Sequence, residues 1–251
     1  MSFESAKALG PLLRFSLFAA ILVVFSIPVS ASAAPTILNI DPIPQHTAEW
    51  CWLAALEMVF KYHDVPSGIP PNLATNVPDR DYQISIVANT SSGLSACRRY
   101  DFQACVHGAG NQATKTLGAT LYNYPPTVGS TSLVATTVYH SLSADVVKNE
   151  IDNDRPIIAG VNTSGRSGNF GQYQPEAEHA VVIVGYDQSG PAGDFAVVVN
   201  DPFDYRFFGV PNPWLRNGAR SIQTGQYELS FAVWTRVMPW IDSIYNIHDK
   251  S

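Results

Sequence analysis

The sequence has few cysteines and few charges, and each shortage excludes a class of protein. Its 251 residues include 3 cysteines, and charged residues make up 14% of the chain, below the roughly 25% that is usual in globular domains. The cysteines and histidines lack the C-x2-C and H-x3-H spacings of zinc sites, so we expect neither a metal nor another cofactor. Lys and Arg number 15 against 21 Asp and Glu and form no basic cluster, which makes nucleic acid a poor candidate partner.

Long hydrophobic runs are also scarce, and the one near the start predicts a signal peptide. It covers residues 15–29 and is interrupted by Pro28, which makes it too short to span a bilayer core of about 30 Å. Basic residues precede it and an A-x-A cleavage pattern ends at Ala33. We therefore expect residues 1–33 to be removed and residues 34–251 to form one domain. The product should be secreted or periplasmic, monomeric and free of membrane contact after processing.

The cysteine count leaves one thiol over in a secreted chain. Cys97 and Cys105 lie in a polar, loop-like stretch where an oxidising compartment would join them. Cys51 is then free, and apolar residues at helical spacing predict a helix over residues 50–62 with Cys51 on its first turn. The unpaired N–H groups and the positive dipole end of a helix favour thiolate over thiol. Cys51 is thus either a nucleophile or a small buried side chain.

The rest of the chain changes from helical to strand patterns. Residues 64–140 are rich in Pro, Asn, Thr, Ser and Gly, and only residues 82–87 and 133–139 look ordered. A helix capped by Ser143 is predicted through about Asn153. Four strands are predicted over residues 157–161, 179–186, 195–200 and 227–237. Helices first and strands later indicate an α+β fold.

Acyl transfer by a thiolate also needs a histidine and a hydrogen-bond donor for the oxyanion. His179 opens a strongly apolar predicted strand, which would hold its ring rigidly. Asn200 and Asp201 end the next strand, and either side chain could accept the second imidazole N–H. Because successive strand residues face opposite ways, only one of the two can do so. Gln45, six residues before Cys51, carries an amide that can donate to the oxyanion.

These residues and their order resemble the papain-like cysteine peptidases. The segments that carry the resemblance are Gln45 with Cys51-Trp52, then His179 to Tyr186, then Asn200-Asp201-Pro202. Trp50-Cys51-Trp52, the two alanines after it, Met58 and the phrase NDRPII at 153–158 are similar to the bacterial C39-like and AvrRpt2-like branches. The Cys-Gly-Ser-Cys-Trp motif of papains is absent, so their substrate preferences are not transferred.

The resemblance implies a papain-like fold, with an N-terminal helical part that carries the cysteine helix packed on a C-terminal antiparallel sheet. It also implies Cys51 as nucleophile, His179 as general base and acid, Asp201 as orienting residue and Gln45 as oxyanion donor. Asp201 is preferred over Asn200 because Asp-Pro matches the bacterial branches.

The predicted function is that of a secreted cysteine peptidase acting on a protein or peptide substrate. Two alternatives remain open at this point. One is a non-catalytic peptide-binding domain that keeps the same scaffold, because a fold does not guarantee its chemistry. The other is an acyl transferase or amidase that uses the same triad.

Overall fold

The computed structural model describes residues 34–68, 78–90, 102–106, 117–124, 132–162, 179–189 and 194–250. The predicted signal peptide and Cys97 lie outside these ranges, so the signal and the Cys97–Cys105 disulfide stay predictions. Cys105 itself is described and is fully buried. In the part of the chain that the structure describes, none of the helices combines the length and the apolar character needed to cross a membrane.

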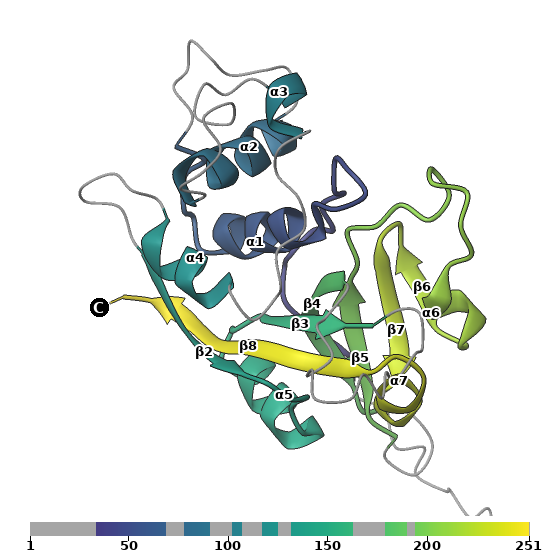
Figure 1. The fold of residues 1–251 in the computed structure, drawn as a ribbon. Helices are drawn as coiled ribbons and strands as arrows, with labels where there is room; N and C mark the ends of the chain where they lie inside the picture. Colours follow the sequence, from purple (N-terminus) through teal and green to yellow (C-terminus); the bar gives the residue numbers. More distant parts are fainter. Residues whose placement is uncertain are drawn as a thin grey trace, which may run out of the picture. The chain divides into compact units, whose positions relative to one another are not determined.

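A sheet of eight antiparallel strands forms the centre of the fold (Figure 1), which confirms the predicted α+β class. Its path runs through β2 (Leu133–Val138), β8 (Trp240–Asp249), β3 (Ile157–Val161), β4 (His179–Asp187), β5 (Ala196–Asn200), β7 (Gln226–Ser230) and β6 (Arg220–Gln223). The short strand β1 (Thr36–Ile37) pairs with β4 beside this path. The three strands predicted over residues 157–200 are therefore confirmed as β3, β4 and β5.

Helices cover both faces of the middle strands. The helices are α1 (Cys51–Tyr62), α2 (Pro78–Thr90), α3 (Phe102–Val106), α4 (Leu117–Asn123), α5 (Ala144–Asp152), α6 (Pro213–Arg216) and α7 (Phe231–Val237). In Figure 1, α1 and α5 lie on opposite sides of the sheet, and both contact β4. Eight of the nine residues of β4 are buried as a result. This two-sided burial explains why its sequence is continuously apolar instead of alternating.

The predicted cysteine helix is confirmed as α1, which begins one residue later than expected, at Cys51. All residues from Cys51 to Phe60 are buried, as expected for a helix that is enclosed on every side. The chain therefore brings Cys51 into the interior, close to the start of β4.

The connection from α5 to β3 explains the NDRPII phrase. Ser143 caps α5, as predicted, by accepting a hydrogen bond from the Val146 N–H. After α5 ends, Asp154 turns the chain with a φ of 58°, a left-handed conformation that Asp tolerates better than most residues. Arg155 then donates to both carboxylate oxygens of buried Glu150, at 2.8 and 2.9 Å. This ion pair holds the turn that leads into β3.

The strand predicted over residues 227–237 is wrong in its second half. The strand β7 ends at Ser230, and Phe231–Val237 forms α7. Trp234 of this helix is fully buried and packs its ring on Trp214 and Trp240, with centroids 5.7 and 4.8 Å apart. Burial of these large rings outweighs the β-propensity of the segment. The segment at residues 82–87, predicted to be ordered, is confirmed as ordered and belongs to the helix α2.

Candidate active site

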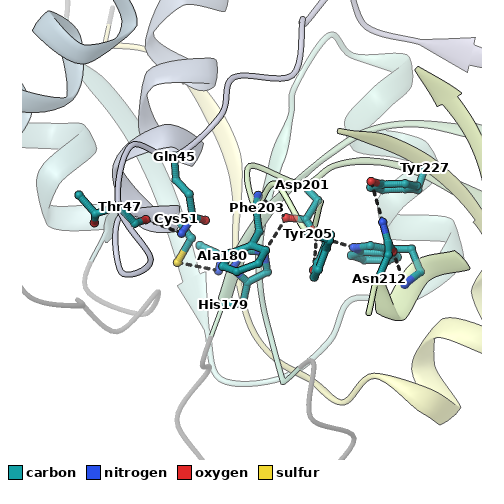
Figure 2. Close-up of polar contacts among 11 residues, drawn as sticks. Gln45, Thr47, Cys51, His179, Ala180, Asp201, Phe203, Tyr205, Asn212 and Tyr227 are labelled. Carbon is teal, nitrogen blue, oxygen red and sulfur yellow. Dashed lines mark hydrogen bonds and ion pairs between the residues drawn. The ribbon is translucent and has the colours of Figure 1, made fainter. Parts of the chain in front are cut away.

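Cys51 is a free thiol at the first residue of α1. Its side chain is buried, with 3% of the residue exposed. Trp50, at the N-cap position, forms no side-chain capping hydrogen bond, so no side chain at that position competes for the N–H groups of the first turn. The Cys51 sulfur accepts a hydrogen bond from the backbone N–H of Ala180 at 3.5 Å (Figure 2). This contact fixes the start of β4 against the start of α1.

His179 is the first residue of β4 and directly precedes Ala180. Its Nε2 lies 2.7 Å from Oδ1 of Asp201. Because an ionised carboxylate only accepts hydrogen bonds, Nε2 carries the proton in this contact. The other ring nitrogen, Nδ1, is thereby left for the thiol of Cys51.

Asp201 directly follows β5, and donors surround its carboxylate. Oδ1 accepts hydrogen bonds from His179 and from the Phe203 N–H at 2.8 Å. Oδ2 accepts from the Tyr205 hydroxyl at 2.7 Å and from the Trp214 indole N–H. Four donors hold this carboxylate in one orientation, which in turn fixes the imidazole. Sequence reasoning missed Phe203, Tyr205 and Trp214 as its partners.

The electrostatics of the pair favour an imidazolium beside a carboxylate. Burial alone would lower the pKa of His179, but the charge and hydrogen bond of Asp201, together with Cys51, raise it well above its ordinary value. For Asp201, burial would raise the pKa, yet the positive charge of His179 and the hydrogen bonds from His179, Phe203 and Trp214 lower it. Burial and the nearby Asp201 raise the pKa of Tyr205, so this hydroxyl keeps its proton and remains a donor. Each charge of the pair therefore stabilises the other.

Asn200 points away from His179, so of the two neighbouring candidates Asp201 is the one that contacts the imidazole. The Asn200 amide donates to the backbone oxygen of Ile40 at 2.8 Å and accepts from the Gln226 amide at 2.8 Å. The residue is fully buried. Through these hydrogen bonds, Asn200 anchors the segment between β1 and Gln45 on the sheet.

Gln45 lies in the loop before α1, with 6% of the residue exposed. Its backbone N–H donates to the Pro202 oxygen at 2.9 Å, which ties this loop to the residue after Asp201. Its side-chain nitrogen donates to the backbone oxygen of Thr47 at 2.7 Å. Figure 2 shows this side chain directed toward Cys51. Because an amide nitrogen carries two hydrogens, the second N–H remains for an oxyanion.

A cavity of about 560 Å³ is lined in part by Asp201. Pro42 to Pro44, the residues that lead to Gln45, form one wall, and residues 201–206 form another. The apolar side chains of Val210 and Leu215 also line it and are half exposed. The structure thus has a partly apolar cavity whose walls continue from both the Gln45 loop and the Asp201 segment.

The fold and these side chains define the class of the protein. A cysteine at the head of a buried helix, with a histidine and an aspartate from neighbouring antiparallel strands, is the arrangement of the papain-like cysteine peptidases. Comparison with family models gives the particular family. Residues 37–216 match the Peptidase_C39 like family, and because this match covers most of the chain, the chain belongs to that family.

The family match confirms the C39-like part of the resemblance, whereas the AvrRpt2-like part stays a prediction. The matched range includes all four predicted site residues. The strands β6, β7 and β8 follow the matched range. A comparison with curated proteins finds no match.

Proposed function

We propose that the chain is a cysteine peptidase that hydrolyses peptide bonds through an acyl-enzyme on Cys51. In this proposal His179 is the general base and acid, Asp201 orients and charges the imidazole, and Gln45 supplies an oxyanion donor. The observation that carries the proposal is the 2.7 Å contact between His179 Nε2 and Asp201 Oδ1. This contact leaves Nδ1 free to exchange a proton with the Cys51 thiol. The interaction of the thiol with the ring contributes to the raised pKa of His179.

The first half of the reaction forms the acyl-enzyme. The Cys51 thiolate attacks the carbonyl carbon of the substrate, and the C=O electron pair moves onto the oxygen. The side-chain N–H of Gln45 and the backbone N–H of Cys51 stabilise this oxyanion. When the C=O bond re-forms, the C–N bond breaks, and the leaving amine takes the proton from Nδ1 of His179. The acyl group is then held as a thioester.

The second half releases the product. The now neutral His179 takes a proton from water at Nδ1, and the hydroxide formed adds to the thioester carbonyl. Collapse of this second tetrahedral intermediate breaks the C–S bond, which regenerates the thiolate and the imidazolium. Asp201 stays ionised throughout, because its lowered pKa keeps it a carboxylate. It therefore stabilises the positive ring without taking its proton.

We also propose the setting in which this reaction takes place. The apolar stretch and cleavage pattern at residues 1–33 support removal of a signal peptide, followed by secretion or periplasmic retention as a monomer. In such a compartment Cys97 and Cys105 would form a disulfide. This pairing would leave Cys51, which the structure shows as free, as the thiol available for chemistry. Reduced and non-reduced peptide maps of the mature protein test the pairing directly.

The proposal is tested by comparing the wild type with a Cys51→Ala variant on casein and on a fluorogenic peptide library. We expect hydrolysis by the wild type and none above background by the variant. Equal activity of both proteins would show that Cys51 is not the nucleophile. Circular dichroism of both proteins is the control, because replacing one small buried side chain should leave the fold intact.

A second candidate function is peptide binding without catalysis, which the cavity beside Asp201 favours. Binding alone would give the Cys51→Ala variant and the wild type the same affinity for a peptide, with no turnover by either. An acyl transferase would instead give a new amide when an amine such as glycine methyl ester competes with water. We place hydrolysis first because a buried, four-donor aspartate on a histidine serves proton transfer and is not needed for binding.

A further inference from the structure

Gln83 of α2 is a fully buried amide that no step of the proposed reaction uses. Its side-chain nitrogen donates to the Pro44 oxygen at 3.2 Å, and its side-chain oxygen accepts from the His46 N–H at 3.4 Å. Pro44 and His46 are the two residues that flank Gln45 in the chain. One side chain thus binds the backbone on both sides of the residue proposed as oxyanion donor.

Glu57 determines which way this amide points. The Gln83 nitrogen donates a second hydrogen bond to Oε2 of Glu57 at 3.0 Å. A carboxylate accepts but does not donate, so it keeps the NH2 end of the amide on its own side and the oxygen toward His46. Lys61, one turn further along α1, contacts the other oxygen of Glu57 at 2.8 Å and balances its charge.

This arrangement connects Gln45 to the helix that carries Cys51. Glu57 and Cys51 lie on the same helix, six residues apart, which is about 9 Å along a rigid axis. We propose that Gln83, oriented by Glu57, is a positioning residue that sets the place of the Gln45 amide relative to the Cys51 sulfur. The inference rests on the proposed role of Gln45 as oxyanion donor. Displacement of a catalytic group by about 1 Å can cost about 100-fold in rate.

The test compares two reactions of the same thiol. Acylation of Cys51 by p-nitrophenyl acetate passes through an oxyanion, whereas alkylation by iodoacetamide does not. A Gln83→Met variant keeps the length and burial of the side chain but removes its hydrogen bonds. We expect acylation to slow by about 10- to 100-fold while alkylation changes by less than about twofold. A Ser85→Ala variant is the matched control, because Ser85 is also buried in α2 but contacts Tyr124 instead.

A second background separates positioning from a general effect on the fold. In a Gln45→Ala protein the oxyanion donor is absent, so adding Gln83→Met should change acylation by less than about twofold. An equal loss with and without Gln45, a parallel loss of acylation and alkylation, or no loss at all would overturn the inference. If Gln83→Met does not fold, Glu57→Gln, which frees the amide to flip, is measured in the same two backgrounds. A wild type that reacts with the ester but cleaves no peptide would refute the peptidase proposal and leave this test intact.

Discussion

Replacing Asp201 with Asn removes one negative charge from the buried pair while it keeps the size of the side chain. In the wild type, each carboxylate oxygen of Asp201 accepts from at least one group that can only donate. This group is the Phe203 N–H for one oxygen and the Trp214 indole N–H for the other. Whichever way the new amide turns, its NH2 faces one of these donors. The variant therefore loses the charge and leaves a buried donor unsatisfied.

The expected loss of activity is large. The imidazolium that protonates the leaving amine is one half of this buried ion pair, so we take the cost of about 3–5 kcal/mol for removing one partner as the loss of transition-state stabilisation. At about 1.36 kcal/mol per factor of ten, kcat/KM should fall by about 10²- to 10⁴-fold. The pKa of His179 should also fall, because Asp201 raises it and burial would then dominate. The imidazolium would be lost at lower pH, so we expect the alkaline limb of the kcat/KM profile to move by more than about one unit toward acid.

The assay is steady-state hydrolysis of a fluorogenic peptide between pH 5 and 10. Asp204→Asn is the matched control, because it makes the same chemical change three residues away. Asp204 is exposed, and its carboxylate accepts hydrogen bonds from the Arg206 and Phe207 N–H groups, away from His179. Activity of Asp201→Asn within about threefold of wild type, together with an unshifted alkaline limb, would show that the Asp201 charge does not support the imidazolium.

Three further predictions concern groups around the site and in the fold. Trp214→Phe removes the indole donor to Asp201, a hydrogen bond to a charged group worth about 1.5–3 kcal/mol, so kcat/KM should fall about 10- to 100-fold; an unchanged value in peptide assays would contradict this role. Glu150→Gln removes the negative charge that pairs with the Arg155 guanidinium. Urea denaturation should therefore show a free energy of unfolding lower by about 3 kcal/mol, and a loss below about 1 kcal/mol would count against the ion pair. Gly185→Ala places a Cβ 2.6 Å from the Thr36 oxygen of β1, so thermal unfolding should show a loss of about 1–3 kcal/mol, whereas an unchanged melting temperature would speak against the close approach.

The sequence predicted those parts of the fold that local signals determine. The helix α1 shows apolar residues at helical spacing, α5 has its Ser143 cap, and β3 to β5 are runs of β-branched residues. Each of these signals lies within about ten residues, so no knowledge of the partner segments is needed. The prediction was wrong for α7, because the packing of Trp234 on its buried aromatic partners outweighs the strand propensity of the segment.

In the candidate site, too, the residues marked by local signals could be predicted, whereas the contacts between distant segments could not. Residue type and order brought out Cys51, His179 and Gln45, and alternation along a strand showed that only one of Asn200 and Asp201 can face the imidazole. The hydrogen bonds that support these site residues could not be predicted from the sequence, because they join segments that are distant in the chain. Gln83, for example, lies 26 residues from Glu57 and 39 from Pro44. No periodic or spacing pattern marks such a contact, since only the packed fold brings the groups together.

If Cys51 is the nucleophile, it carries the acyl group during the reaction, and this intermediate can be isolated. The purified protein is mixed with a fluorogenic peptide substrate, quenched in acid within milliseconds, and examined by mass spectrometry before and after proteolytic digestion. We expect an added mass equal to the acyl part of the substrate on the peptide that contains Cys51, and none in a Cys51→Ala variant. Turnover with the acyl mass on another residue, or with no covalent adduct under conditions that trap thioesters, would contradict it.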